Sequence, residues 1–322
     1  MDTTKLGRTG LTVSVAGLGC GGNSRLGLGR GLPHSQCVGL VRAALDLGVN
    51  FLDTAEAYGT EEIVGEAVRA VDRGEVVIST KSRYAKAGAL LSATDVIDNL
   101  DESLRRLQTD YVDVFHVHAV KPEHYAYVVS EIVPALMTER DKGKLRYLGI
   151  TESPPSDPDQ AMLRRAIQDD MWDVMMLGFH MMHQGAGRTI LPVTAQKGIG
   201  TLIMFAVRNI FSRPDELRAT LAKLAADGAI PTSLAAASEP LDFLIHDDGA
   251  RSLTDAAYRF ARHQSGVDVV LFGTGAVAHL EQNIASICAP PLPEGDVQAV
   301  HDWFGELTGI GLDLPDRVRA RA

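Results

Sequence analysis

The sequence has 322 residues, of which 45% are hydrophobic and 22% are charged, an ordinary composition for a globular protein with a large core. Its formal net charge is −10 and it contains no long basic run, so we expect neither nucleic acid nor an anionic membrane as a partner. No apolar stretch reaches the roughly 18 residues that span a bilayer, and residues 1–5 lead into no signal-peptide core. The three cysteines lack metal-ligand spacing, which predicts a reduced, cytoplasmic protein.

The predicted elements begin with a β-hairpin in residues 4–14, where Gly7 and Gly10 separate two short strand-like pieces. Residues 15–19 form the next predicted strand, and Gly21 and Gly22 open a glycine-rich loop after it. This loop lacks the glycine spacing of a dinucleotide fingerprint, and no helix begins at it. We therefore interpret it as a flexible connection at the end of a strand.

From residue 35 onward, helical and strand-like patterns alternate regularly. Helices are predicted at residues 35–47, 61–71, 94–107, 122–142, 159–169, 188–197, 252–264 and 277–287, and strands end at Leu52, Thr80, Val117, Ile150, Gly178, Phe205 and Phe272. Residues 215–226 form one more predicted helix inside a connection that has no clear pattern. After Pro290 the sequence predicts one short helix and a charged tail.

Eight strands that alternate with helices indicate an α/β fold of the (β/α)8 TIM-barrel type, with an N-terminal β-hairpin and a C-terminal extension. A doubly wound open sheet would also alternate, but the absence of fingerprint glycines favours the barrel. Such barrels run to about 250 residues or more as one domain. We therefore expect residues 1–322 to form a single domain.

Four ionisable side chains stand at or just beyond the ends of successive strands. Asp53 follows the apolar run at residues 49–52, and Tyr58 comes five residues later; Lys81 and His118 follow the next two apolar runs. The reactive face of such a barrel is at the carboxyl ends of its strands, so we predict that the four form one catalytic site. Each member also has a structural interpretation. Asp53 and Lys81 could form a structural ion pair, Tyr58 could pack within a loop, and His118 could be a structural histidine. The joint pattern favours catalysis.

The pair His116-x-His118 allows a rival interpretation as a metal-dependent hydrolase. Both histidines would point into the barrel, because side chains alternate along a strand. Such a site would need further ligands, and His180 and His183 are the nearest candidates. No aspartate ends the eighth strand, where Phe272 is followed by Gly-Thr-Gly, so we expect no metal.

The motif Asp53-Thr-Ala-x-x-Tyr58-Gly resembles the first signature of the aldo-keto reductases, and Lys81 and His118 stand in the contexts of that family's other catalytic residues. Residues 101–113 are similarly characteristic, and the resemblance extends from residues 6–10 to residues 280–283. Residues 129–136 and 149–151 resemble the branch that contains L-galactose and related aldose dehydrogenases.

The resemblance implies an NAD(P)-dependent oxidoreductase of carbohydrate metabolism. It would interconvert a carbonyl (an aldehyde, ketone or sugar lactone) with an alcohol or lactol, so the expected partner is a small carbonyl compound or sugar. Tyr58 would be the general acid and base, and Lys81 would lower the pKa of its phenol from about 10. Asp53 would orient Lys81, and His118 would hydrogen-bond the substrate oxygen. Oligomeric state is not predicted.

The positions that would hold the nicotinamide cofactor depart from the family pattern. Thr151 and Glu152 replace the usual Ser-Asn pair, and Met176 replaces a glutamine. The full set of predicted cofactor-binding residues is Gly21, Gly22, Thr151, Glu152, Met176, Phe205, Ala206, Val207, Arg208, Gly273, Thr274, Gly275, His279, Gln282 and Asn283. The departures leave open a second interpretation, a catalytically weak nicotinamide-binding sensor or scaffold on the same barrel.

Two of these positions bear on the choice between NAD(H) and NADP(H). Gly273 and His279 stand where NADPH-preferring members of the family usually carry Lys and Arg. The loss of fixed positive charge weakens the preference for a 2′-phosphate. We therefore predict that NAD(H) is at least competitive with NADP(H), and slightly favoured.

Overall fold

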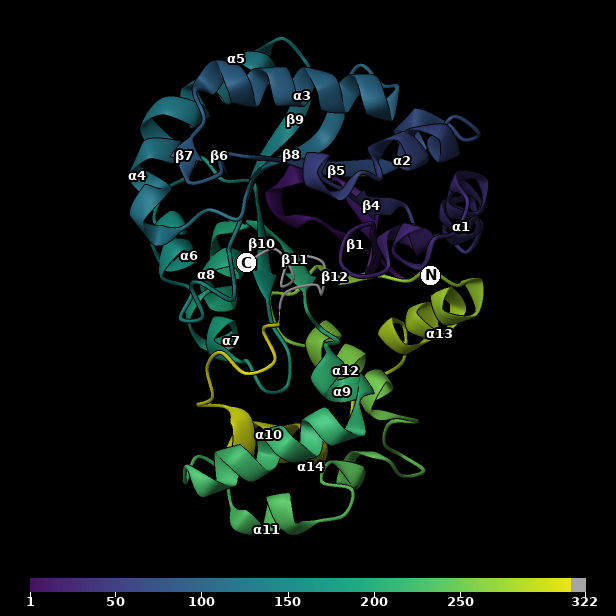
Figure 1. Cartoon of the computed structure of the whole chain (residues 1–322), viewed down its shortest axis with the longest axis vertical. Coiled ribbons are helices and arrows are strands. Elements are labelled where there is room, and N and C mark those ends of the chain that lie inside the picture. The colour runs from purple at the N-terminus through teal and green to yellow at the C-terminus, as the bar shows by residue number, and fades with distance from the viewer. Residues whose placement is uncertain (314–322) are drawn as a thin grey trace.

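A computed structural model describes residues 1–313 of the chain, so the end of the charged tail, at residues 314–322, lies outside the described residues. Eight parallel strands close into a barrel in the order β10-β11-β12-β3-β4-β5-β8-β9, as Figure 1 shows from one side. The strands are β3 (Ala16–Gly19), β4 (Phe51–Asp53), β5 (Val77–Arg83), β8 (Val112–His118), β9 (Leu145–Thr151), β10 (Val174–Gly178), β11 (Gly200–Met204) and β12 (Val269–Phe272). The prediction of a (β/α)8 barrel is confirmed.

The predicted N-terminal hairpin is also present, with β1 (Thr3–Lys5) antiparallel to β2 (Thr12–Ser14). Its apolar residues Leu6 and Val13 share one buried cluster with Phe51, Val77 and Val114, which stand near the beginnings of barrel strands. The hairpin therefore closes the amino end of the barrel with apolar side chains, and the carboxyl end stays open for a site.

The helices that follow the barrel strands are α1 (His34–Asp46), α2 (Glu61–Val68), α3 (Ala93–Leu107), α5 (Val133–Asp141), α6 (Ala161–Ala166), α8 (Leu191–Lys197), α12 (Leu253–Arg262) and α13 (Val277–Ile287). Most lie within a few residues of the predicted ranges. The helix α3 begins with a capping box, in which Ser92 and Asp95 satisfy each other's backbone N–H groups. In addition, β6 (Ala85–Lys86) and β7 (Ala89–Leu90) form a small antiparallel hairpin that the sequence pattern did not predict.

Two predicted helices are interrupted at prolines. The segment at 122–142 is divided into a 3-10 turn (Pro122–His124), α4 (Tyr125–Tyr127), a π-helical turn (Val128–Ile132) and α5, which has Pro134 in its first turn. The segment at 188–197 becomes α7 (Gly185–Thr189) and α8, with Pro192 in the first turn of α8. Proline has no backbone N–H to donate, so it is accommodated where a new helix begins.

The long connection after β11 carries α9 (Asn209–Ser212), α10 (Pro214–Ala226) and α11 (Thr232–Ala236), and the C-terminal extension carries α14 (Glu294–Phe304). Figure 1 shows α10, α11 and α14 together below the barrel, and the chain after α14 running back towards it. None of the helices within residues 1–313 is long and apolar enough to cross a membrane.

The interior of the barrel changes from apolar to polar towards the carboxyl ends of the strands. Lys81 on β5 pairs in register with His116 on β8, which pairs with Gly149 on β9. A Cβ atom at Gly149 would lie 2.2 Å from Nδ1 of His116, so the glycine makes the room that this buried ring occupies. The strand register thus places a layer of ionisable groups directly below the open end.

Candidate active site

The four predicted catalytic residues meet at the carboxyl end of the barrel. Asp53 is the last residue of β4, Lys81 lies within β5, and His118 is the last residue of β8. Tyr58 ends a 3-10 turn (Glu56–Tyr58) directly after β4. The turn stops at Gly59, whose φ of +69° is readily adopted by glycine, and this folds the tyrosine back over the strand ends.

Asp53 and Lys81 form a buried ion pair. Nζ of Lys81 lies 2.7 Å from both carboxylate oxygens of Asp53 and donates a further hydrogen bond of 2.7 Å to the carbonyl of Thr54. The Ser79 hydroxyl donates to Oδ1 of Asp53 at 2.8 Å. An ammonium group has three protons, and three acceptors surround this one. The lysine is therefore fixed in position as a charged group.

The electrostatic surroundings keep Lys81 protonated. Burial alone lowers the pKa of its ammonium, but the adjacent Asp53 carboxylate and the Tyr58 oxygen outweigh that effect and raise the pKa above its ordinary value. Lys81 thus carries a full positive charge at neutral pH, inside the barrel and 0% exposed.

Tyr58 lies between this charge and His118. Nζ of Lys81 is 5.1 Å from the centroid of the phenol ring, and the His118 ring meets it edge-on at a centroid distance of 5.7 Å. The ring fits here because residue 21 is glycine: a Cβ at Gly21 would lie 2.6 Å from the Tyr58 ring. Arg25 fixes the turn by donating from Nε to the Tyr58 carbonyl at 2.7 Å.

The pKa of Tyr58 differs from the sequence-based expectation. The charge of Lys81 does lower it, but burial raises it by more, and the net pKa lies above its ordinary value of 10.0. Lys81 thus acts on this pKa in the expected direction, but its effect is smaller than that of burial. At neutral pH the phenol therefore holds its proton and is able to donate it.

His118 is an uncharged imidazole at neutral pH. Burial, together with the positive charges of Lys81 and Arg83, lowers the pKa of its ring to about 3. Its Nδ1 atom is buried and has no hydrogen-bond partner among the described residues. A neutral imidazole offers one N–H donor, which suits a group that orients a substrate oxygen without competing with Tyr58 as an acid.

A cavity of about 1030 Å³ opens at this end of the barrel. Asp53, Tyr58, Gly273, His279 and Asn283 are among the residues that line it. Of the predicted cofactor-binding residues, those that line the cavity are Gly21, Gly22, Met176, Phe205, Val207, Arg208, Gly273, Thr274, Gly275, His279, Gln282 and Asn283. Lys81 and His118 are not among its lining residues but contact the Tyr58 ring, which is. Thr151, Glu152 and Ala206 are buried and do not line it.

Glu152 has an environment that its sequence position did not reveal. Its Oε1 accepts hydrogen bonds from the Gly178 N–H and from the Gln160 amide, whereas Oε2 is buried without a partner among the described residues. Burial raises the pKa of this carboxyl to about 8. Glu152 is therefore protonated at neutral pH and can donate a hydrogen bond, which an ionised glutamate cannot do.

Arg208 is engaged by the C-terminal segment. Its Nη2 donates to the carbonyl of Asp313 and, at 2.9 Å, to the Asp313 carboxylate, and its guanidinium lies 4.1 Å from the Phe205 ring centroid. Asn209 also donates to this carboxylate, at 3.0 Å. Asp313 is thus part of the cavity wall, although the sequence contained no signal that would have placed it there.

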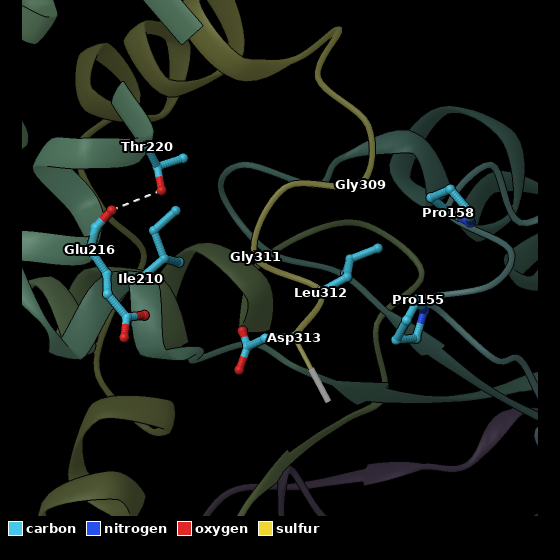
Figure 2. Close-up of a pocket in the computed structure, with 9 residues that line it drawn as sticks. All are labelled: Pro155, Pro158, Ile210, Glu216, Thr220, Gly309, Gly311, Leu312 and Asp313. Carbon is cyan, nitrogen blue, oxygen red and sulfur yellow. Dashed lines mark hydrogen bonds between the residues drawn. The ribbon is translucent and has the colours of Figure 1, made fainter. Parts of the chain in front are cut away.

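A smaller cavity of about 380 Å³ lies beside the first, and Figure 2 shows the side chains around it. It is lined by Pro155, Pro158, Ile210, Glu216, Thr220, Gly309, Gly311, Leu312 and Asp313. Asp313 lines both cavities, so residues 309–313 form a border between them. The loop after β9, the connection after β11 and the C-terminal extension therefore meet beside the site.

The further ligands that the rival metal site would need, His180 and His183, face each other in an isolated β-bridge, with ring centroids 5.8 Å apart. Within residues 1–313, no group of three or more His, Cys, Asp or Glu side chains is arranged to hold a metal ion.

Comparison with known sequences identifies the class of protein to which this barrel and its site belong. The family model "Aldo/keto reductase family" matches residues 17–303, and the chain belongs to this family of NAD(P)-dependent oxidoreductases. It is 30% identical to L-galactose dehydrogenase of Arabidopsis thaliana over 294 residues, which covers 89% of this chain and 88% of the relative. It is also 24% identical to the uncharacterized oxidoreductase YqkF of Bacillus subtilis, covering 93% of this chain and 95% of the relative.

Solved structures agree with the fold. The aldo-keto reductase AKR11C1 of Bacillus halodurans superposes with a TM-score of 0.72 at 20% identity, covering 97% of this chain and 100% of that one. A thermostable aldo-keto reductase, Tm1743, superposes with a TM-score of 0.69 at 22% identity, covering 94% and 99%. At these identities the likeness concerns the barrel alone.

Proposed function

We propose that this protein transfers hydride reversibly between a nicotinamide cofactor and a small carbonyl compound or sugar, with Tyr58 as the acid and base. The observation that carries the proposal is the position of Tyr58, which borders the large cavity with the buried Lys81–Asp53 pair behind it. The relative named L-galactose dehydrogenase favours a sugar lactol and its lactone as the substrate pair.

The cavity is suited to an extended dinucleotide. Its volume of about 1030 Å³ is at the upper end of the range for small-molecule sites. Glycines at 21, 22, 273 and 275 leave backbone uncovered along its wall, which permits close approach by a ligand. When bound there, a nicotinamide supplies or accepts the hydride, and the protein supplies orientation and electrostatics.

Each residue of the site has a distinct role in this proposal. As a carbonyl carbon gains hydride, its oxygen takes the proton of the Tyr58 hydroxyl, whose O–H bond breaks as the new O–H bond forms. The charge of Lys81 stabilises the phenolate that remains, and Asp53 keeps Lys81 charged and in place. His118 would orient the substrate oxygen as a neutral donor. Oxidation of the alcohol follows the same steps in reverse.

The decisive experiment follows nicotinamide absorbance with NAD⁺ and NADP⁺ over a panel of aldoses, and with NADH and NADPH over aldehydes and ketones. Tyr58→Phe is expected to lower turnover by roughly 10²–10⁴-fold, the usual contribution of a positioned acid. The matched control is Tyr111→Phe, which removes a hydroxyl just before β8 at the opposite end of the barrel. It should leave turnover unchanged.

Turnover that survives in Tyr58→Phe would contradict the proposed role of this residue. Nicotinamide binding without any turnover that depends on Tyr58 would instead favour a sensor or scaffold. The ratio of kcat/KM for the two cofactors tests the prediction that NAD(H) is at least competitive, and a hundredfold preference for NADPH would contradict it.

A further inference from the structure

The loop after β3 is packed against the loop after β12. It contains a 3-10 segment (Arg25–Arg30), and a Cβ atom at Gly275 would lie 3.0 Å from Cα and 3.2 Å from N of Gly27. That Cβ atom would also lie 3.8 Å from Cδ of Arg30. A side chain at residue 275 would therefore push this loop away. The glycine-rich segment is a docked element, and it brings Arg30 to the wall of the large cavity.

Arg30 lines the large cavity together with residues of the loop after β12, among them Gly273, Gly275 and His279. The family resemblance places the cations that bind a 2′-phosphate at the positions of Gly273 and His279. Cδ of Arg30 is 3.8 Å from the Cβ position of Gly275, so Arg30 stands next to these two positions and supplies a cation on the same stretch of wall.

The charge of Arg30 has no partner among residues 1–313: no hydrogen bond or ion pair of its guanidinium is found there. Other arginines of the cavity wall are engaged, since Arg251 pairs with Asp255 at 2.9 Å and Arg208 with Asp313 at 2.9 Å. Arg30 is exposed, and a planar guanidinium in such a place can form two parallel hydrogen bonds to a phosphate.

We infer that Arg30 recognises the ribose 2′-phosphate of NADP(H) and replaces the cations that the family usually carries at the positions of Gly273 and His279. The choice between NAD(H) and NADP(H) would then depend on the loop after β3, which is held in place by the contact between Gly27 and Gly275. This inference rests on the proposed nicotinamide-dependent function. It deepens that function by assigning a specificity residue.

The test is isothermal titration of NADP⁺ and of NAD⁺, which differ only by the 2′-phosphate. Arg30→Gln is expected to weaken NADP⁺ binding about tenfold, the size of one charge-assisted contact, and to change the Kd for NAD⁺ by less than twofold. Arg30→Lys keeps the charge and should retain most of the NADP⁺ affinity. The matched control is Arg164→Gln, which removes the same charge from an exposed position of α6 and should change neither Kd.

The possible outcomes distinguish failure of the inference about Arg30 from failure of the proposed function. Equal weakening of both cofactors by Arg30→Gln would place Arg30 at the diphosphate and overturn the inference. Unchanged NADP⁺ binding in that variant, or wild-type protein that binds NAD⁺ alone, would overturn it as well, while the proposed function would stand. If neither cofactor binds the wild-type protein, the proposed function fails too. A variant that binds NAD⁺ normally is folded, and an unchanged urea midpoint establishes folding where NAD⁺ binding is weakened.

Discussion

The acid–base behaviour of Tyr58 is set by two opposing effects on its pKa. Burial raises the pKa and the charge of Lys81 lowers it, with burial the larger of the two. The phenol is therefore a proton donor at neutral pH, and its conjugate base becomes more abundant as the pH rises. In the proposed mechanism the oxidation direction needs that base, so we expect alkaline conditions to favour it.

The buried pair of Asp53 and Lys81 predicts a large effect of Lys81→Met. The substitution leaves the Asp53 carboxylate buried with Ser79 as its remaining hydrogen-bond donor. Removing one partner of a buried pair typically costs about 3–5 kcal/mol, because the other charge is left uncompensated. We expect a loss of this size in the free energy of unfolding, measured by urea titration, together with loss of turnover.

A double variant and a surface control sharpen this test. Asp53→Asn combined with Lys81→Met should recover part of the lost stability, because no unpaired charge remains. Lys223→Met breaks an exposed pair with Asp227 and should cost about 1 kcal/mol or less. A loss for Lys81→Met no larger than that of Lys223→Met would refute the buried charge pair.

At the scale of single elements, strand β9 fits against β8 because residue 149 has no side chain. Gly149→Ala would place a Cβ 2.2 Å from Nδ1 of His116, a ring that is 0% exposed and has little room to move. Overpacking of this kind typically costs about 1–3 kcal/mol. We expect that loss in the free energy of unfolding, and reduced turnover, because β8 also carries His118.

The matched control for this prediction is Gly39→Ala in helix α1. A Cβ at Gly39 meets no atom within 4 Å, and alanine is the better helix former by about 1 kcal/mol. Gly39→Ala should therefore stabilise the protein, whereas Gly149→Ala destabilises it. Equal effects of the two substitutions would show that the contact with His116 is not tight.

On the scale of the whole molecule, three buried histidines (His116, His180 and His183) and the partly buried His118 predict sensitivity to acid. Burial holds the pKa of His118 at about 3 and that of His183 at about 4, and it lowers the pKa values of His116 and His180 well below 6.5. In the unfolded chain each would titrate near its ordinary pKa of about 6.5. Stability from a lowered pKa is present above the unfolded value and is lost as the pH falls below it.

Each of these histidines should therefore remove up to about 1.4 kcal/mol of stability per pH unit below about pH 6. The measurement is the urea midpoint at pH 7.5, 6.0 and 5.0, and we expect a steep fall between the last two. His34→Gln alters an exposed histidine and should leave that fall unchanged. A midpoint that stays constant down to pH 5.0 would contradict the burial of neutral histidines.

Local patterns were sufficient to predict the barrel and to select the residues of the candidate site. The alternation of strands and helices depends on side-chain periodicity, which is written along the chain. Asp53, Tyr58, Lys81 and His118 could be found because each lies at or near the carboxyl end of a strand, and a closed parallel barrel brings those ends together. The same periodicity did not predict the helix interruptions at Pro134 and Pro192. Proline lacks a backbone N–H donor, and each predicted helix is divided there.

Tertiary structure decided what depends on contacts between distant segments. The protonation of Glu152, the net pKa of Tyr58 and the pairing of Arg208 with Asp313 all follow from burial or from a neighbour far away in sequence. The same holds for Arg30, which the sequence placed in a flexible loop and the fold places in the cavity wall. The amino-acid sequence determined the barrel and the residues at its strand ends, because both follow from local periodicity. Their charge states and the lining of the cavity were fixed only when the barrel closed, because desolvation and pairing exist only in the packed chain.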